Sequence, residues 1–537
     1  MSSKYIIVAG GVISGTGKGV TAASIGLLLR LRGFNVEIIK LDPYLNINAG
    51  ILAPSQHGEC FLCDDGTECD LDLGHYERIA DIQVSKDNIV TQGIINKEIN
   101  EEQEKGKYLG QTIQVIPHVT NKIIERLEHL GKKADVVIAE IGGTVGDIES
   151  SAFYKAVTQF KVKHGADCMI VMVAPILWVP TIKEWKTKPL QRSVIDLQSY
   201  GVVPDLLFCR VEREVPEKIL QKVSDLTYVP RSLVFDAPDV KSVYQVPIEF
   251  YNRQVDDIIS DKLRLKRTGC RIKKYRELVE AYMSGEMLLV NIGIFGKYDN
   301  CDEAYISLKE ALYHAGIANG VKVEIRWVKA QEVETSKHLA KFFEGLHGVI
   351  IPGGFDSRGI EGKIRAIKYV RENKIPFLGI CLGLQCAVIE YARNVCNLED
   401  ANSTEFNKTT KHPVVHHIEG QENLVKLCGT MRLGGYDCEL SKGSQAHELY
   451  EGKMARERHR HRYEVNPEYQ ETLEAKGFKT TGVNPQTGLI EIMEMGQDAH
   501  PYFIGTQSHP EFRSRLLQPS PLFKGLIAAA KKNCQSC

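Results

Sequence analysis

The chain has 537 residues, enough for about two to four domains, and an ordinary globular composition, 43% hydrophobic and 25% charged. Its net charge of −1 excludes a global field that would draw it to nucleic acid or an anionic membrane, so we expect neither as a partner. The longest apolar run, residues 169–179, is too short to span a bilayer and contains Pro175. Fourteen scattered cysteines, with no secretory signal ahead of them, indicate reduced thiols and a cytoplasmic protein.

The first half of the chain alternates short, continuously apolar segments with helical patterns. Strands without a polar face are buried on both sides, which is typical of a parallel sheet flanked by helices. We therefore predict an α/β domain over residues 1–266. Its predicted strands are residues 5–9, 36–41, 135–141, 168–174 and 206–211, and its first helix is predicted over residues 21–33.

The segment AGGVISGTGKGVTAAS, residues 9–24, follows the first predicted strand and opens a helix, which is the context of a phosphate-binding loop. It departs twice from the pattern G-x-x-x-x-G-K-[ST]. Gly11 stands one place early, and Gly19 follows Lys18 where a hydroxyl normally ligates magnesium. We still predict triphosphate binding, because the backbone N–H groups of a Gly-rich loop and a lysine suit an anion. The proposed ATP-binding loop residues are Ser14, Gly15, Thr16, Gly17, Lys18 and Gly19.

Without that hydroxyl, a magnesium ion needs ligands from elsewhere in the chain. The candidates are Asp70 or Asp72 in CDLDLGHYER, and Glu140 near the end of the strand predicted at 135–141. A carboxylate at the carboxyl end of a parallel strand lies beside the phosphate loop, and hard cations prefer oxygen ligands. Spacing alone leaves the choice between the two aspartates open.

Residues 261–285 are basic and polar and separate the first half from a fresh apolar run at 287–296. We predict a linker over residues 267–286. Its basic cluster could contact nucleic acid, but it lacks interleaved aromatic residues, so a solvated linker is favoured. The alternation of apolar segments and helical patterns then resumes at residues 322–328, 348–354, 375–383 and 501–512. We therefore predict a second α/β domain, with a mostly parallel sheet flanked by helices, over residues 287–537.

Residues 379–383 read G-x-C-x-G between a predicted strand and a helical pattern, which is a nucleophile elbow with cysteine in place of serine. At the start of a helix the dipole favours the thiolate of Cys381, and backbone N–H groups are available to an oxyanion. His509 and Glu511 are two positions apart in SHPE, so on an extended segment they face the same side and can act as base and orienter. The alternative is a buried core cysteine with surface His and Glu residues; their placement at strand ends favours catalysis.

GICLG followed by SHPE resembles the triad class of glutamine amidotransferases. The resemblance implies hydrolysis of the glutamine amide through a thioester at Cys381, His509 and Glu511, with release of ammonia. It implies that Gly354, in IPGGF at the end of the apolar segment 348–354, and Leu382 belong to the oxyanion site. It further implies glutamine contacts by Gln385, Glu405 and Arg462, with Arg460 as an alternative to Arg462.

The whole chain resembles the CTP synthase family, in the order of that family's domains. The matching segments are GGVISGTGKG, KLDPYLNINAG, QHGE, TECDLDLGHYER, GQTIQVIPHVT, EIGGTVGDIES, ANSTEF, GTMRLG and ERHRHRYEVN. The resemblance implies that ATP phosphorylates the 4-oxygen of UTP and that ammonia from L-glutamine displaces the phosphate to give CTP. Magnesium with ATP is the implied cofactor, with no organic cofactor.

The resemblance also assigns residues to the nucleotides. Lys18 and Lys40 would contact the ATP phosphates and the transferring phosphoryl group, and Asp72 and Glu140 would ligate magnesium. UTP would bind across a subunit interface, and CTP would inhibit by feedback. The residues implied for these pyrimidine nucleotides are Ser14, Asp147, Ile148, Glu149, Lys188, Gln191, Arg192, Ser193 and Lys222. Leu190 replaces the family's usual threonine, and Arg192 replaces a neutral or histidine side chain.

Regulation and assembly are likewise implied only by the family. GTP activation would involve Lys297, Tyr298, Arg358 and Glu361, next to a loop in which Asp356 replaces a glycine. The family forms homotetramers and filaments. Two other functions stay open from the sequence: a nucleotide-gated filament or scaffold protein, and an amidotransferase with another acceptor. A zinc site at Cys60, Cys63 and Cys69, completed by Cys534 and Cys537, is disfavoured because those pairs lie at opposite ends of the chain.

Overall fold

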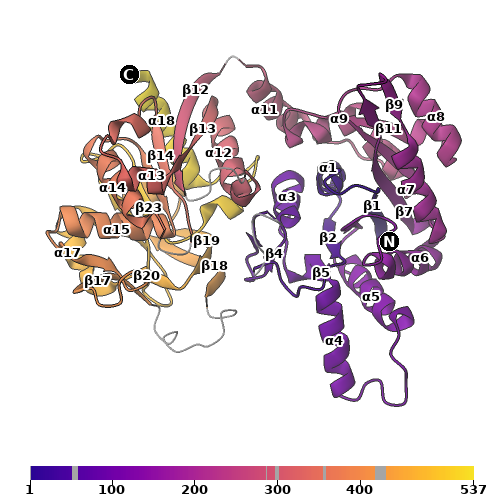
Figure 1. The fold of residues 1–537 in the computed structure, drawn as a ribbon, viewed down its shortest axis with the longest axis horizontal. Coiled ribbons are helices and arrows are strands. Elements are labelled where there is room, and N and C mark those ends of the chain that lie inside the picture. Colours follow the sequence, from indigo (N-terminus) through magenta and orange to yellow (C-terminus); the bar gives the residue numbers. More distant parts are fainter. Residues whose placement is uncertain are drawn as a thin grey trace. The chain divides into compact units, whose positions relative to one another are not determined.

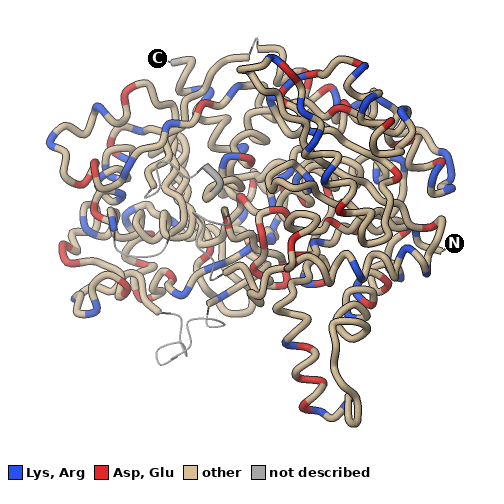
Figure 2. Tube along the Cα trace, turned by 45° about the vertical axis from the view of Figure 1, so that its right-hand side comes forward, with Lys and Arg blue, Asp and Glu red and all other residues tan. Residues whose placement is uncertain are grey.

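The computed structural model describes residues 2–50, 58–285, 287–296, 302–354, 358–417 and 431–536 (Figure 1). The chain divides into two compact units, one formed by Met1–Ile51 with Asp72–Val279 and the other by Leu52–Leu71 with Glu280–Cys537. Acidic and basic residues are interspersed along the trace in both units (Figure 2). Within the described ranges, no helix is both long enough and apolar enough to cross a membrane.

The first unit is built on one seven-stranded sheet in which all pairs are parallel, with the order β11-β10-β7-β1-β6-β2-β5. The strands are β1 (Lys4–Gly10), β2 (Val36–Asp42), β5 (Ile89–Thr91), β6 (Val136–Ile141), β7 (Cys168–Pro175), β10 (Leu206–Val211) and β11 (Val234–Pro238). The five predicted strands of this half are confirmed to within one residue at each end. Because β1 lies between β6 and β7, the loops that follow these three strands meet at one edge of the sheet.

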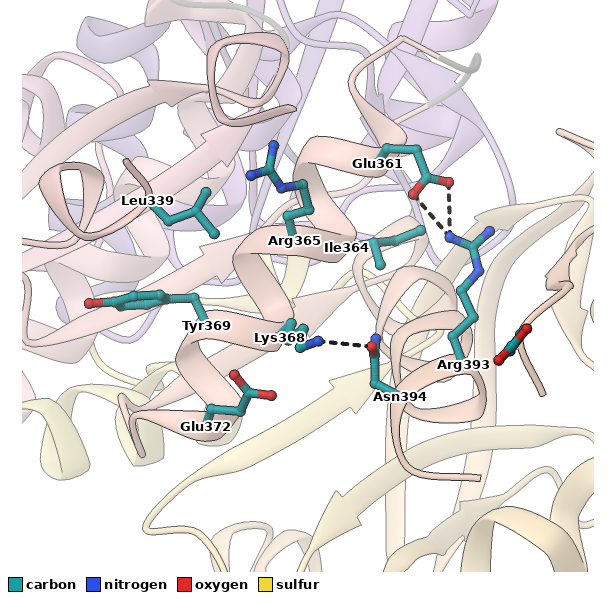
Figure 3. Close-up of a pocket in the computed structure, with 10 residues that line it drawn as sticks. Leu339, Glu361, Ile364, Arg365, Lys368, Tyr369, Glu372, Arg393 and Asn394 are labelled. Carbon is teal, nitrogen blue, oxygen red and sulfur yellow. Dashed lines mark hydrogen bonds and ion pairs between the residues drawn. The ribbon is translucent and has the colours of Figure 1, made fainter. Parts of the chain in front are cut away.

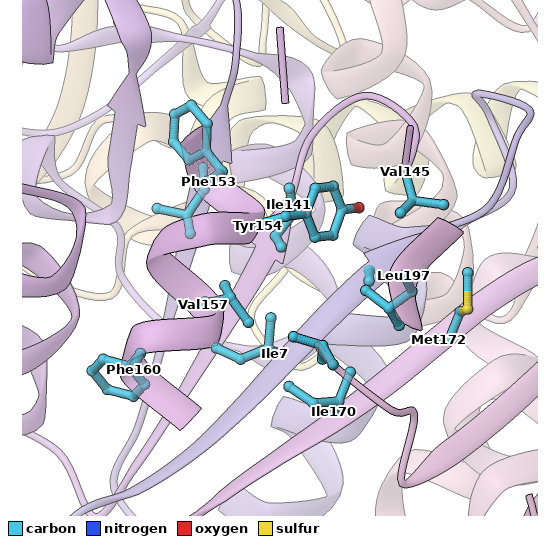
Figure 4. Close-up of a cluster of buried hydrophobic side chains, with 14 of the residues drawn as sticks. Ile7, Ile141, Val145, Phe153, Tyr154, Val157, Phe160, Ile170, Met172 and Leu197 are labelled. Atoms are coloured by element: carbon cyan, nitrogen blue, oxygen red, sulfur yellow. The ribbon is translucent and has the colours of Figure 1, made fainter. Parts of the chain in front are cut away.

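Helices cover this sheet and supply its apolar core. Their bounds are α1 (Lys18–Leu31), α3 (Leu71–Ala80), α4 (Gln92–Glu104), α5 (Thr120–Gly131), α6 (Ser151–His164), α7 (Lys188–Ser199), α8 (Glu217–Thr227), α9 (Val246–Asn252), α10 (Val255–Lys262) and α11 (Lys273–Met283). Figure 4 shows Phe153, Val157 and Phe160 of α6 beside Ile7 of β1 and Ile170 of β7. The apolar stripe of α6 therefore packs on the strands that carry the loops of interest.

The second unit holds a nine-stranded mixed sheet with the order β13-β12-β14-β15-β23-β22-β21-β18-β19. The first five strands in that order are parallel, and the remaining pairs are antiparallel. The strands are β12 (Leu288–Gly296), β13 (Val321–Lys329), β14 (Gly348–Ile351), β15 (Phe377–Ile380), β18 (Arg432–Leu440), β19 (Met454–His461), β21 (Phe478–Val483), β22 (Ile490–Met495) and β23 (Phe503–Thr506). The predicted fold class, two α/β domains, is confirmed, with a parallel sheet in the first unit and a mixed sheet in the second.

Alternate residues of the central strands of this sheet enter two separate cores, as expected for a sheet covered on both faces. Ile350 of β14 packs in one core, and its neighbours Val349 and Ile351 pack in the other. The covering helices are α12 (Ile306–Asn319), α13 (Ala330–Thr335), α14 (Ile360–Glu372), α15 (Leu382–Asn394), α16 (Gln445–Leu449), α17 (Gln470–Glu474) and α18 (Pro521–Ser536). Three small strands, β16 (Ala401–Ser403), β17 (His412–His417) and β20 (Tyr463–Val465), form a separate sheet.

A short hairpin from the first half of the chain belongs to the second unit. It consists of β3 (Phe61–Leu62) and β4 (Glu68–Cys69). Asp64 in its turn accepts hydrogen bonds from Arg458 Nε at 2.6 Å and from Arg513 Nη1 at 2.8 Å. Chain order groups this hairpin with residues 1–266, whereas packing groups it with the second unit. The antiparallel hairpin of β8 (Leu177–Val179) and β9 (Glu184–Lys186) stays in the first unit.

Candidate active sites

The predicted phosphate loop joins β1 to α1, and its glycines are needed for its shape. Gly15 and Gly17 have φ values of 72° and 84°, in the left-handed region that glycine adopts without strain. A Cβ added at Gly10 would lie 2.7 Å from Lys18 Nζ. Glycine at position 10 therefore leaves room for the Lys18 side chain. Ser14 and Gly15 are exposed at the tip, and Thr16 is buried.

Lys18 begins α1 and turns its side chain back over the end of β1. Its Nζ donates a hydrogen bond to the carbonyl oxygen of Gly143 at 2.8 Å, in the loop that follows β6. Burial lowers the pKa of this amine, and the carboxylate of Glu140 opposes that effect. The amine is therefore a nearly buried cation at the edge of the sheet where an anion would meet the loop.

Lys40 of β2 joins two of the predicted acidic residues. Its Nζ donates to Glu140 Oε1 at 2.9 Å and also to the carboxylate of Asp72. The hydroxyl of Tyr76 donates to the other oxygen of Glu140. Burial alone would lower the pKa of Lys40, but the two carboxylates raise it well above its usual value. The structure thus brings Lys40, Asp72 and Glu140 together as a charged group.

The position of Gly19 explains the missing hydroxyl. A Cβ at Gly19 would lie 2.5 Å from Asp72 Oδ1 and 3.3 Å from Glu140 Oε2. These carboxylates occupy the space that a serine or threonine side chain would need. Of the two aspartates that the sequence left open, Asp72 is the one that approaches the loop. Two carboxylates beside a phosphate loop suit magnesium, which takes one or two protein carboxylates together with substrate phosphates.

Apart from Ser14 in the phosphate loop, the residues implied for the pyrimidine nucleotides lie on three segments of the first unit. Asp147, Ile148 and Glu149 are exposed in the loop between β6 and α6, with Ile148 87% exposed. Lys188 and Gln191 lie in the first turn of α7, and the exposed Lys222 lies on α8.

Ser193 and Arg192 are already engaged within the fold. The hydroxyl of Ser193 is buried, accepts the N–H of Val12 at 3.0 Å and donates to the carbonyl of Pro189 at 2.8 Å. Ser193 therefore supports the phosphate loop from α7. Arg192 is exposed and pairs with Asp196 at 2.8 Å.

A mostly apolar cavity of about 150 Å³ lies beside the phosphate loop, and the sequence analysis did not find it. Thr16, Gly17, Val20 and Thr21 form its loop side. Its other walls come from β7, β10, β11 and α9 and the segments around them: Val173, Arg210, Asp236, Ala237, Pro238, Val240, Val243, Val246, Glu249, Phe250 and Arg253. The residues of these other walls are scattered over the chain and belong to no sequence motif. Only the fold shows that they line one cavity.

Cys381 stands at a sharp elbow between β15 and α15, as predicted. Its φ of 52° and ψ of −102° are strained for a residue with a side chain. A Cβ at Gly379 would lie 2.7 Å from the carbonyl carbon of Gly383, and one at Gly383 would lie 2.2 Å from Ile351 O. Both glycines of G-x-C-x-G are therefore required by close backbone approach. The N–H of Cys381 donates to Thr506 O at 2.7 Å, which ties the elbow to β23.

His509 and Glu511 lie directly after β23, next to Cys381. His509 Nδ1 is 2.7 Å from Glu511 Oε1. Burial alone would lower the pKa of His509, but the charge of Glu511 and the charge and hydrogen bond of Cys381 raise it to about 10. A Cβ at Gly353 would lie 2.6 Å from His509 Cε1, so the loop after β14 also touches the imidazole. The three side chains form a connected cysteine, histidine and carboxylate group.

The loop after β14 also approaches the start of α15. A Cβ at Gly354 would lie 3.6 Å from Leu382 Cδ2 and 3.9 Å from Lys363 Nζ. This geometry places Gly354 next to Leu382, the other predicted oxyanion residue, which directly follows Cys381 in the chain. Lys363 on α14 is buried and was not singled out by the sequence.

The three implied glutamine contacts all lie near Tyr463. Gln385 is buried and donates its amide to Tyr463 O at 2.9 Å. Burial raises the pKa of the Tyr463 phenol, Glu405 raises it further and Arg462 opposes them, so both ions lie near that ring. The guanidinium of Arg460, the alternative to Arg462, pairs with Glu68 of the hairpin at 2.8 Å.

Of the residues implied in GTP activation, Lys297 and Tyr298 lie outside the described residues. Arg358 is exposed just before α14. Glu361 accepts from Arg393 Nη1 at 3.0 Å, at an open hollow of about 550 Å³ beside α14 (Figure 3). In the same view Lys368 donates to Asn394 at 3.1 Å. This part of α14 thus carries paired charges.

Cys63 and Cys69 of the hairpin are buried thiols, and Cys60 just before it is half-buried. Cys63 Sγ and Cys69 Sγ are 3.6 Å apart. Burial raises the pKa of Cys60 to about 12 and that of Cys69 well above its usual value, so both stay protonated near neutral pH. In the part of the chain that the structure describes, no group of three or more His, Cys, Asp or Glu side chains could hold a metal ion.

The two halves of the chain, one with the phosphate loop and one with the Cys381 triad, match two known protein families. Residues 4–265 match the model for the CTP synthase N-terminus, and residues 301–529 match that for class-I glutamine amidotransferases. The CTP synthases of Methanococcus maripaludis and Caldanaerobacter subterraneus are each 47% identical to this chain over 98% of it, covering 99% and 98% of those relatives. The glutaminase domain of Trypanosoma brucei CTPS, solved with bound acivicin, is 36% identical over 45% of this chain and 94% of that chain, with a TM-score of 0.42. The chain therefore belongs to the CTP synthase family.

Proposed function

We propose that this protein converts UTP to CTP, using ATP and ammonia from glutamine. The observation that carries the proposal is that one chain of this family holds both a phosphate loop with a Lys40–Asp72–Glu140 group and a Cys381–His509–Glu511 triad. The first suits phosphoryl transfer, and the second suits amide hydrolysis. We propose residues 1–266 as the synthetase domain, 267–286 as the linker and 287–537 as the amidotransferase domain.

At the triad, Cys381 attacks the side-chain amide of glutamine as the thiolate. His509, with its pKa raised to about 10, is protonated and donates its proton to the departing ammonia. The N–H groups of Gly354 and Leu382 stabilise the oxyanion, and Glu511 orients the imidazolium of His509 and stabilises its charge. Water then cleaves the thioester and releases glutamate. Gln385, Glu405 and Arg462 hold the substrate, whose α-carboxylate suits a guanidinium.

At the phosphate loop, the 4-oxygen of UTP attacks the γ-phosphate of ATP. The resulting phosphate is a better leaving group than a carbonyl oxygen, so ammonia can displace it. Lys18 and Lys40 stabilise charge on the transferring oxygens. Asp72 and Glu140 would hold a magnesium ion, which when bound neutralises phosphate charge. The base of ATP occupies the apolar cavity beside Thr16 and Gly17.

The remaining assignments follow the family and are proposals of the same kind. UTP is held by Ser14, Lys188, Gln191, Arg192, Ser193 and Lys222, and CTP inhibits through Asp147, Ile148 and Glu149. Since the hydroxyl of Ser193 already supports Val12, we propose that it acts on the nucleotide through the loop. GTP activates through Lys297, Tyr298, Arg358 and Glu361, and the chain forms homotetramers in the cytoplasm.

The experiment that tests this function measures CTP formation by the purified full-length chain with UTP, ATP and magnesium, supplied with either glutamine or ammonium. Formation of CTP in both reactions supports the proposal. Absence of CTP in both contradicts it, and nucleotide-dependent filaments under those conditions would instead support a scaffold protein. Glutamine hydrolysis without CTP would point to an amidotransferase with another acceptor.

Replacing Gly19 by serine tests the explanation of the phosphate loop. We expect Gly19→Ser to lower CTP formation from both nitrogen sources by at least about tenfold, because the new side chain displaces Asp72, and overpacking of this kind costs about 1–3 kcal/mol. Steady-state rates at varied ATP concentration measure this. Gly269→Ser, at a glycine with open space around it, is the control. A Gly19→Ser enzyme of normal or higher activity would mean that residue 19 can supply a metal ligand after all.

The pH profile of glutamine hydrolysis tests the role of Glu511. Because its carboxylate helps to raise the pKa of His509 to about 10, the wild-type alkaline limb should lie near that pH. In Glu511→Gln the imidazolium loses its proton at lower pH, so the alkaline limb moves down, and kcat/KM falls by at least about 100-fold. Glu439→Gln, at an exposed position of β18, should change neither quantity. An unmoved alkaline limb in Glu511→Gln would contradict the assignment.

A further inference from the structure

Gln507 lies directly against the sulfur of Cys381, and the triad chemistry above does not use it. It follows β23, its side chain is completely buried, and its Nε2 donates to Cys381 Sγ at 3.6 Å. Its backbone N–H donates to Glu491 O at 2.8 Å, which fixes its position. The nucleophile therefore touches a second side-chain donor in addition to His509.

The direction of this amide follows from its neighbours. The two ends of a glutamine amide look alike, so its orientation must be assigned from hydrogen-bond partners. Gln385 Nε2 donates to the main-chain carbonyl of Tyr463 at 2.9 Å, and a carbonyl can only accept. The same NH₂ group donates to Gln507 Oε1 at 3.3 Å. The nitrogen of Gln507, not its oxygen, must then face the sulfur.

This orientation distinguishes the two protonation states of Cys381. The carbonyl oxygen of Arg460, 3.9 Å from Sγ, can only accept a hydrogen bond and so favours the neutral thiol. The N–H of Gln507 can donate to a thiolate and so favours the charged form. A charge-assisted hydrogen bond of this kind in a buried site is stronger than one between neutral groups.

We propose that Gln507 is a catalytic residue of the glutaminase centre, whose amide N–H stabilises the Cys381 thiolate before attack and again when it leaves. This inference rests on the proposed function of Cys381 as nucleophile. During attack the sulfur electron pair forms the bond to the amide carbon, and the N–H···S hydrogen bond weakens. When water cleaves the thioester, the C–S bond breaks, sulfur regains the pair and the hydrogen bond re-forms.

The other titratable groups around the triad stay constant when only Gln507 is changed. They are His509 and Glu511 after β23, Arg460 with its partner Glu68, Lys363 beside Gly354, and His459 and His461 of β19, whose pKa values are lowered by burial. A shift in the titration of Cys381 in a Gln507 variant of unchanged fold therefore reports on the missing N–H group.

The test uses the full-length protein with Gln507→Glu, Gln507→Met and, as a matched control, Gln486→Glu at an exposed loop position. The rate of Cys381 alkylation by iodoacetamide is followed by mass spectrometry of its peptide between about pH 5 and pH 10, together with kcat/KM for glutamine. In Gln507→Glu the midpoint of alkylation should rise by at least about one pH unit, because a carboxylate then opposes the thiolate. Gln507→Met should shift it by less in the same direction, and kcat/KM near neutral pH should fall by about 10–100-fold.

A loss of kcat/KM in both Gln507 variants with an unmoved midpoint would overturn the proposal and leave Gln507 a structural residue. If Gln507→Glu does not fold, the alkylation midpoint of Gln507→Met still tests whether Gln507 stabilises the thiolate. Failure of the proposed function gives a different result: the wild type would not hydrolyse glutamine. Its alkylation midpoint and those of the variants would still decide whether Gln507 stabilises the thiolate.

Discussion

Cys381→Ala should abolish CTP formation from glutamine and leave CTP formation from ammonium close to wild type. The thiolate is the only group in the proposed route that bonds to glutamine, so its loss should lower glutamine-dependent synthesis by at least about 10⁴-fold. The ammonium route does not use the triad. Cys381 belongs to an elbow in the second unit, and alanine keeps the Cβ that the elbow already accommodates.

The measurement compares both nitrogen sources at saturating UTP and ATP. Cys396→Ala, which removes a half-buried thiol elsewhere in the second unit, is the control and should keep both activities. Loss of the ammonium route in Cys381→Ala with an unchanged melting temperature would contradict the separation of the two sites. Retention of the glutamine route would contradict the assignment of Cys381 as nucleophile.

The strands that the sequence predicted share one property, which is burial on both faces of a parallel sheet. Residues 168–174, for example, are apolar throughout and correspond to β7. The edge strands β5 and β11 were not predicted from the sequence. The sequence of β5, IVT, is too short to show a strand pattern, and that of β11, VFDAP, is too polar.

The antiparallel strands of the second sheet were not predicted from the sequence for a different reason. β19 reads MARERHRH, yet Glu457, Arg458 and His459 are all buried. Two of these side chains have partners within the fold: Arg458 binds Asp64, and Tyr450 donates to Glu457. Sequence patterns count such residues as surface, because nothing local reveals a partner that lies about 390 residues away.

The same contrast applies to the sites. The residues found from sequence stand where backbone geometry demands a particular residue type, as with Gly379, Gly383 and the thiol between them. Gln507 directly precedes the SHPE motif, but glutamine fits many surroundings, and only the facing sulfur reveals its use. The choice of Asp72 over Asp70 likewise depended on the first turn of α3, whose orientation no spacing rule supplies.

Lys18→Ala should have the opposite signature to Cys381→Ala: loss of CTP formation from both glutamine and ammonium, with glutamine hydrolysis preserved. Lys18 is the nearly buried amine beside the phosphate loop, and preorganised charge of this kind contributes about 10²–10³-fold to a rate. We expect synthesis to fall by at least about 10³-fold, since substrate binding is weakened as well. Hydrolysis of glutamine, which takes place in the second unit, should stay within about threefold of wild type.

The melting temperature shows whether Lys18→Ala loses activity because the amine is missing or because the protein is misfolded. Burial lowers the pKa of Lys18, so its charge costs the folded state, and removing it should leave the melting temperature within a few degrees. Lys40→Ala is different, because it leaves the buried Glu140 and the half-buried Asp72 without the amine that pairs with them and should destabilise the fold by about 3–5 kcal/mol. Lys132→Ala, at an exposed position, is the neutral control. If Lys18→Ala melts normally and still makes CTP from ammonium, the ATP site lies elsewhere, because no other role proposed for this amine would spare that reaction.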